Sequence, residues 1–313
     1  MKSTRNSVCI LLGLGLAAGL LAGILIPRNY GGGNILSRWG IPMSTHIPAP
    51  PQRVWAIVDI PKNDVERISL FILAGQSNMS GMGTEFPAEP HDPRILVFGN
   101  DYRWHIAAEP VDDPFNQVDK VSEDIDAGYS PAMAFAQVLL EHDPQMVIGL
   151  IPCAKGASSI AEWQRNLSDQ SLYGSCLKRE RAASTVGTLA GFLIFQGEAD
   201  AMDAIQFPEH IVNPTHWSAL FSAFVNDFRL DLSDPDLPVV YAQIGTTTTP
   251  EAFPNWELVK EQQRLTRLPA SAMITTDDLP LLDNVHFTTE SYQIIGARFA
   301  EAYWELIQQD TKR

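Results

Sequence analysis

Six short segments of the chain are apolar along their whole length, and these segments limit the possible folds more than any other feature. A strand with one face in water alternates apolar and polar residues, whereas these segments do not alternate. Continuous apolar runs are typical of parallel strands that helices cover on both faces. The six segments are residues 68–74, 95–98, 146–151, 189–195, 238–244 and 272–274.

Segments with helical spacing lie between these runs. Ser130 and Pro131 supply a capping hydroxyl and a proline for the first turn, ahead of apolar residues 133–140. Residues 217–228 form a second candidate helix, and a last one opens at Thr288 and continues with apolar residues at helical spacing. The alternation of strands and helices predicts an α/β domain with three layers, α/β/α, around a mainly parallel sheet.

The N-terminal segment differs from the rest in composition. Val8 to Ile26 carries no charge, and Lys2 and Arg5 precede it. As a helix it would span about 28 Å, close to the roughly 30 Å hydrocarbon core of a membrane. It is either an uncleaved transmembrane anchor or a cleaved signal peptide. The run ends at Pro27 without a small-residue cleavage site, which favours the anchor.

The N-terminal segment also sets the predicted domain boundaries and location. We assign residues 1–27 to the signal anchor or signal peptide, 28–61 to a linker rich in Gly and Pro, and 62–313 to one catalytic domain. With the N-terminal positive charges on the cytoplasmic side, we expect the domain to lie outside the cytoplasm. It would be tethered to the membrane by the N-terminal helix, or secreted.

Charge and cysteine content exclude several classes of function. Asp and Glu total 37 against 22 for Lys and Arg, which gives a net charge of −15 and disfavours nucleic acid as a partner. The chain has 3 Cys and neither a CxxC pair nor an HExxH run, so a structural zinc site is not expected. Outside the cytoplasm Cys153 and Cys176 could pair, although Cys153 could equally be a buried thiol after a strand.

The active sites of open α/β sheets lie beyond the carboxyl ends of the strands, so residues at strand ends are the candidates. The first predicted strand ends in Gln76-Ser77-Asn78. A tight turn from strand to helix there would lift the Ser77 hydroxyl out of the sheet and aim backbone N–H groups at a developing negative charge. The alternative is an ordinary serine that caps a helix.

Two further segments carry polar residues that could take part in catalysis. Asp283 and His286 precede the last helix, and a histidine oriented by a carboxylate is the base that a serine nucleophile needs. Gln196 follows another strand, and its amide could donate to an oxyanion. Each motif alone is commonly structural. Their joint position, in the order Ser, Asp, His, indicates a hydrolase.

Five segments resemble the SGNH/GDSL hydrolase superfamily, in its sialate O-acetylesterase-like branch, which includes carbohydrate esterase family six and its plant-type acetylesterases. They occur in the family's order and span the predicted domain. They are FILAGQSNMSGMG from Phe71, AGYSPAMAFAQVLL from Ala127, GLIPCAKGASSIAEW from Gly149, FLIFQGEAD from Phe192 and DNVHFTTESYQIIG from Asp283. The resemblance implies a flavodoxin-like sheet and a serine esterase without metal or cofactor.

The resemblance also implies a role for each matching residue. Ser77 would be the nucleophile, His286 the base and Asp283 its orienting partner. The oxyanion hole would use the Ser77 N–H, the Gln196 side chain and the N–H of a glycine. Gly156 is the first candidate for that glycine, and the alternatives are Gly81, Gly83 and Gly149. The residues expected to support this site without reacting are Gln76, Asn78, Glu198 and Asp200.

The implied substrate is an acetylated carbohydrate such as acetylxylan, and the negative charge of the chain favours a neutral one. A general short-chain carboxylesterase and a non-catalytic carbohydrate-binding protein on the same fold are the alternatives. The chain departs from the family in having Phe195 before the QGE motif, and Ala157 where the family often has a second glycine. Residues 100–129, rich in Asp and Pro, would form a long loop that either shapes the sugar pocket or is plain surface.

Overall fold

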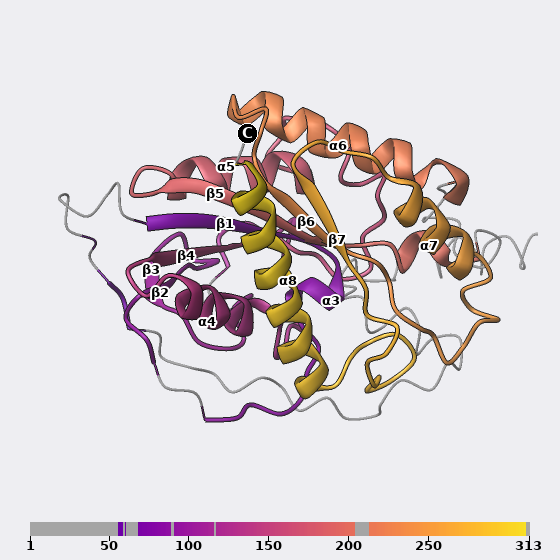
Figure 1. The fold of residues 1–313 in the computed structure, drawn as a ribbon, viewed down its shortest axis with the longest axis horizontal. Coiled ribbons are helices and arrows are strands. Elements are labelled where there is room, and N and C mark those ends of the chain that lie inside the picture. Colours follow the sequence, from indigo (N-terminus) through magenta and orange to yellow (C-terminus); the bar gives the residue numbers. More distant parts are fainter. Residues whose placement is uncertain are drawn as a thin grey trace, which may run out of the picture. The chain divides into compact units, whose positions relative to one another are not determined.

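The computed structural model describes residues 56–58, 60, 68–88, 91–115, 117–203 and 213–310. Within these residues seven strands form one sheet in the order β3-β2-β4-β1-β5-β6-β7 (Figure 1). The strands are β1 (Ile68–Gly75), β2 (Ile95–Phe98), β3 (Trp104–Ile106), β4 (Val147–Pro152), β5 (Thr188–Phe195), β6 (Val239–Ala242) and β7 (Ser271–Ile274). All neighbours pair in parallel except β2 and β3, which are antiparallel. The mainly parallel sheet is confirmed.

Helices connect the strands. They are α3 (Ser77–Ser80), α4 (Ala132–His142), α5 (Leu172–Ala183), α6 (Trp217–Leu232), α7 (Trp256–Leu265) and α8 (Thr289–Asp310), with short 3₁₀ turns η2 (Ala199–Ala201) and η4 (Pro214–His216). Figure 1 shows α4 and α8 on one side of the sheet and α5 and α6 on the other. The three-layer α/β/α architecture is therefore confirmed.

The aromatic core explains why the strands carry no polar face. Phe71 of β1 packs against Phe135 of α4 and Tyr303 of α8, with ring centroids 4.9 and 5.0 Å away. On the other face Phe192 of β5 packs against Phe224 of α6 at 5.6 Å. Both faces of the central strands are thus removed from water, as the unbroken apolar runs require.

Four parts of the fold differ from the sequence expectation. β3 lies inside residues 100–129, which we expected to be a loop without strands. Residues 56–58, assigned to the linker, extend this edge: Val58 N–H donates to Trp104 O at 2.9 Å, and Ile57 bridges His105. Helices α5 and α7 were not expected, because their apolar residues are few among charged ones.

The predicted anchor, residues 8–26, and most of the predicted linker lie outside the described residues. No helix in the described part of the chain is both long enough and apolar enough to cross a membrane.

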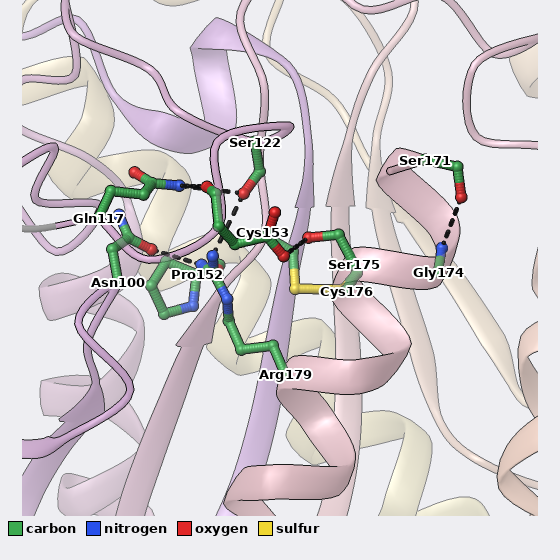
Figure 2. Close-up of a disulfide and its surroundings, with 11 residues drawn as sticks. Asn100, Gln117, Ser122, Pro152, Cys153, Ser171, Gly174, Ser175, Cys176 and Arg179 are labelled. Carbon is green, nitrogen blue, oxygen red and sulfur yellow. Dashed lines mark hydrogen bonds between the residues drawn. A yellow bond between two sulfur atoms is a disulfide. The ribbon is translucent and has the colours of Figure 1, made fainter. Parts of the chain in front are cut away.

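A disulfide joins the end of β4 to α5 (Figure 2). Cys153 follows β4 directly and Cys176 lies in the second turn of α5, with their Cα atoms 5.3 Å apart. Both cysteines are buried. The covalent link fixes the start of the loop that carries Gly156, one of the predicted site residues.

A buried arginine holds residues 100–129 against the same end of β4. Arg179, one turn after Cys176 on α5, donates to Asn100 Oδ1, to the Pro152 carbonyl and, at 3.2 Å, to Ser122 Oγ (Figure 2). It is 1% exposed. A buried guanidinium is stable only when it has acceptors. Here the acceptors come both from residues 100–129 and from β4, so Arg179 links this segment to the sheet.

We predict that the disulfide contributes substantially to stability. Replacing both Cys153 and Cys176 by Ser should lower the free energy of unfolding by about 3 kcal/mol, because the bridge closes a loop of 23 residues in the unfolded chain. Urea denaturation of the wild-type protein and of the double variant measures the difference in the free energy of unfolding. Reductant should bring the wild-type protein to the midpoint of the variant and leave the variant unchanged; equal midpoints without reductant would contradict the prediction.

Candidate active site

The first strand presents Ser77 at the carboxyl edge of the sheet. Gly75 ends β1 with φ of +131°, and a Cβ there would lie 2.0 Å from the Phe195 carbonyl oxygen, so only glycine allows β1 and β5 to approach this closely. Gln76 N–H donates to the same carbonyl at 2.9 Å. The chain then turns directly into α3, whose first residue is Ser77.

The three residues predicted as a triad are in hydrogen-bond contact. His286 Nε2 lies 2.8 Å from Ser77 Oγ, and His286 Nδ1 lies 2.8 Å from Asp283 Oδ2. The other oxygen of Asp283 accepts the backbone N–H groups of Val285, at 3.0 Å, and His286, at 2.9 Å. The carboxylate therefore shapes its own loop and orients the imidazole toward the hydroxyl.

The electrostatics of the site favour a basic imidazole. Burial alone would lower the pKa of His286, but the attraction and hydrogen bond of Asp283, with the charges of Glu198 and Asp124, raise it above the ordinary 6.5. Burial likewise opposes ionisation of Asp283, yet His286 and the two backbone N–H groups bring its pKa below the usual value. Each member of the pair stabilises the charged form of the other.

Asn78 joins three segments of the site. Its Nδ2 donates to Glu198 Oε1 at 2.5 Å and to Val285 O at 3.1 Å, and its Oδ1 accepts from the Tyr292 hydroxyl at 2.7 Å. Burial raises the pKa of Glu198, whose other oxygen has no partner among the described residues. The nucleophile turn, the loop after β5 and the histidine loop are thereby held together.

Gln76 makes a second link to the loop after β5. Its Oε1 accepts the N–H groups of Gly197, at 3.3 Å, and Ala199, at 3.2 Å. Gln76 is 3% exposed. Its burial and these two hydrogen bonds fix the position of its neighbour, Ser77.

Gln196 is placed differently from our prediction. Its amide nitrogen donates to the Ser158 carbonyl at 3.1 Å and to the Asp200 carboxylate, and its Oε1 accepts from Trp217 Nε1 at 2.9 Å. Burial raises the pKa of Asp200 to about 7. Both amide hydrogens of Gln196 are thus engaged, so this arrangement leaves none for an oxyanion.

Gly156 is also engaged elsewhere. Its N–H donates to Asp124 Oδ2 at 2.7 Å, and a Cβ at this position would lie 2.8 Å from the same oxygen. Only glycine fits at this position, because the Asp124 carboxylate lies too close to leave room for a Cβ. The next residue, Ala157, has φ of +58°, in the left-handed region that favours glycine. The N–H groups of Ala157 and Ser77 have no acceptor within the described ranges.

Sequence reasoning did not find Asp124. It is one of eight acidic residues among residues 100–129, and no spacing separates it from the others. Its importance comes from a contact between segments 32 residues apart. Its hydrogen-bond partners, the Ser80 hydroxyl and the Gly156 N–H, lie 44 and 32 residues away along the chain, so the sequence around Asp124 did not reveal them.

The fold and the site together define an esterase, and comparison with known proteins gives the family. A family model described as carbohydrate esterase, sialic acid-specific acetylesterase, matches residues 67–305. A relative from Arabidopsis thaliana, described as a probable carbohydrate esterase, is 32% identical over 269 residues, covering 78% of this chain and 91% of that protein.

Two solved structures are similar to this one. The X-ray structure of the Arabidopsis thaliana protein is 28% identical, with a TM-score of 0.64, and the match covers 77% of this chain and 98% of that one. A carbohydrate acetylesterase from Xanthomonas citri is 19% identical, with a TM-score of 0.58 over 76% of this chain and 56% of that one; this likeness concerns the fold alone.

The chain belongs to the carbohydrate esterase family of sialic acid-specific acetylesterases. It is accordingly a carboxylic ester hydrolase, with a three-layer α/β/α fold around a mainly parallel sheet.

We predict that esterase activity falls on acidification with a midpoint above pH 6.5, because His286 must be neutral to accept a proton and its pKa is raised. Asp283→Asn removes the charge that raises this pKa, so the midpoint should move to lower pH and kcat should fall about 10²–10⁴-fold. The pH profile of kcat/KM for 4-nitrophenyl acetate measures the midpoint, and kcat at the pH optimum measures the loss of turnover.

The matched control for this measurement is Asp278→Asn. Asp278 is an exposed carboxylate that pairs with Arg298 at 2.5 Å and does not contact the site. Its removal should leave the profile unchanged. An acid limb that stays in place in Asp283→Asn would contradict the electrostatic coupling between Asp283 and His286.

Proposed function

We propose that this ester hydrolase removes acetyl groups from the hydroxyls of neutral carbohydrates through an acetyl-enzyme formed on Ser77. The observation that carries the proposal is the unbroken chain from Asp283 through His286 to Ser77, with both hydrogen bonds at 2.8 Å. A serine hydroxyl is a weak nucleophile, and a histidine at this distance is the base that activates it. Family membership supports acetylated carbohydrate as the substrate class.

In the first half of the reaction His286 Nε2 accepts the Ser77 proton as Oγ bonds to the acetyl carbonyl carbon. The carbonyl oxygen becomes negative, and we assign its stabilisation to the N–H groups of Ser77 and Ala157, which have no acceptor among the described residues. The imidazolium, stabilised by Asp283, then protonates the departing sugar oxygen as the carbon–oxygen bond breaks.

In the second half a water molecule replaces the sugar hydroxyl. His286 takes its proton, the water oxygen bonds to the acetyl carbon, and the tetrahedral intermediate collapses as the proton returns to Ser77 Oγ. Acetate leaves and the free serine is restored. Each step uses only side chains and backbone groups of this chain.

Two properties of the chain support a neutral substrate outside the cytoplasm. The net charge of −15 repels polyanions, which disfavours pectin and sialylated chains. The Cys153–Cys176 disulfide is typical of oxidising compartments, which supports export by the N-terminal segment. We therefore propose an extracytoplasmic acetylesterase, tethered to a membrane or secreted.

We predict that Ser77→Ala lowers acetate release from acetylated xylan, and hydrolysis of 4-nitrophenyl acetate, by more than about 10³-fold, because no other group forms the acetyl-enzyme. The control is Ser222→Ala, which removes a serine of α6 that bonds only to the Ser218 carbonyl, at 2.8 Å. Circular dichroism confirms that both variants fold. Wild-type rates in folded Ser77→Ala would rule out the serine mechanism.

A panel of esters tests the substrate class with the same wild-type protein. Acetylated xylan and glucomannan should release acetate faster than acetylated pectin or O-acetylated sialic acid, because the chain is acidic. Hydrolysis of simple short-chain esters without acetate release from any carbohydrate would instead identify a general carboxylesterase. Absence of activity on every ester would identify a binding protein.

A further inference from the structure

The carboxylate of Asp124 lies between the nucleophile turn and the loop after β4. Its Oδ2 accepts the Ser80 hydroxyl at 2.9 Å and the Gly156 N–H at 2.7 Å. The residue is 2% exposed. A buried carboxylate is costly unless it accepts hydrogen bonds, and here both donors come from segments of the candidate active site.

Each of the two donors is adjacent to a group that the proposed reaction uses. Ser80 ends α3, and its hydroxyl also lies 3.2 Å from the carbonyl oxygen of Ser77. Gly156 precedes Ala157, whose N–H we assign to the oxyanion. One oxygen atom of Asp124 therefore sets the distance between the nucleophile turn and an oxyanion donor.

The segment that carries Asp124 is firmly held. Glu123, its neighbour, accepts Lys155 Nζ on its backbone carbonyl at 2.6 Å, so consecutive residues of one segment bind consecutive residues of the other. Ser122 accepts from the buried Arg179 at 3.2 Å. These contacts fix the backbone from which the Asp124 carboxylate reaches the site.

The charge of Asp124 also acts on the catalytic base. The acidic groups that act on His286 are Asp283 on its own loop, Glu198 after β5 and Asp124 from residues 100–129, and each of them raises the pKa of His286. Two more charged groups take part in the electrostatics of this segment. Burial is the main cause that raises the pKa of Asp112 to about 7; the charge of Asp124 contributes to this rise and the charge of Lys155 opposes it. A negative charge at Asp124 favours the imidazolium.

We propose that Asp124 is a positioning residue whose carboxylate holds the Ser77 turn and the Lys155–Ser158 loop in register. This role rests on the proposed function and deepens it. Asp124 touches neither the substrate nor the reacting atoms. It acts through Ser80 and Gly156.

The test is Asp124→Asn, which keeps the shape of the side chain and removes its charge. We expect kcat for 4-nitrophenyl acetate to fall about 10–100-fold with little change in KM, because the groups that bind the ester remain while their alignment is lost. The acid limb of kcat/KM should move to lower pH, because a charge that raises the His286 pKa is gone.

Glu123→Gln is the matched control. It removes a negative charge one residue away, on a side chain that pairs with exposed Lys120 and points away from the site. This variant should keep the wild-type kcat and pH profile. A wild-type kcat in folded Asp124→Asn overturns the proposal, and so does an equal loss of kcat in Glu123→Gln, since any change of charge in this segment would then produce the result.

Ser80→Ala keeps the proposal testable if Asp124→Asn fails to fold. It removes one donor and leaves the carboxylate charge, so kcat should fall severalfold while the acid limb stays in place. Full kcat in folded Ser80→Ala overturns the positioning role. Ser77→Ala assayed beside these variants separates the two proposals: if it remains active, the serine mechanism fails, whatever the result at Asp124.

Discussion

The backbones of β1 and β5 meet without a side chain between them at the carboxyl edge of the sheet, and the site depends on this contact. Gly75 approaches the Phe195 carbonyl so closely that any Cβ would collide with it. The approach brings the turn after β1 against the loop after β5, where Gln76 and Asn78 bind that loop. The packing of the two backbones therefore positions Ser77 independently of its hydrogen bond to His286.

Several carboxylates act on a single histidine, and the hydrogen bonds that they accept explain how the site tolerates their negative charge. Asp283 and Asp124 each accept backbone N–H groups in addition to side-chain donors. Backbone donors compensate for lost hydration without adding a competing cation. The site can therefore keep a net negative field, which favours positive charge on His286 during the reaction.

Sequence predicts those parts of the fold and the site that depend on residues close together in the chain. Unbroken apolar runs predicted six strands, whereas β3 is a three-residue edge strand in a polar segment, and the charged surfaces of α5 and α7 hid their buried faces. Asp283 and His286 were found because they share one loop. Gln196 and Gly156 were assigned to the oxyanion hole, yet their donors bind Asp200 and Asp124, partners that only the folded chain brings together.

The disulfide and Arg179 have a consequence for how the enzyme can diversify. Arg179 binds Asn100 and Ser122 of residues 100–129, and the disulfide joins its helix to the end of β4. Val118 and Ile125 of the same segment remain 62% and 54% exposed. The outer surface of this segment can thus change among descendants of this chain while the contacts that hold Asp124 in place stay constant.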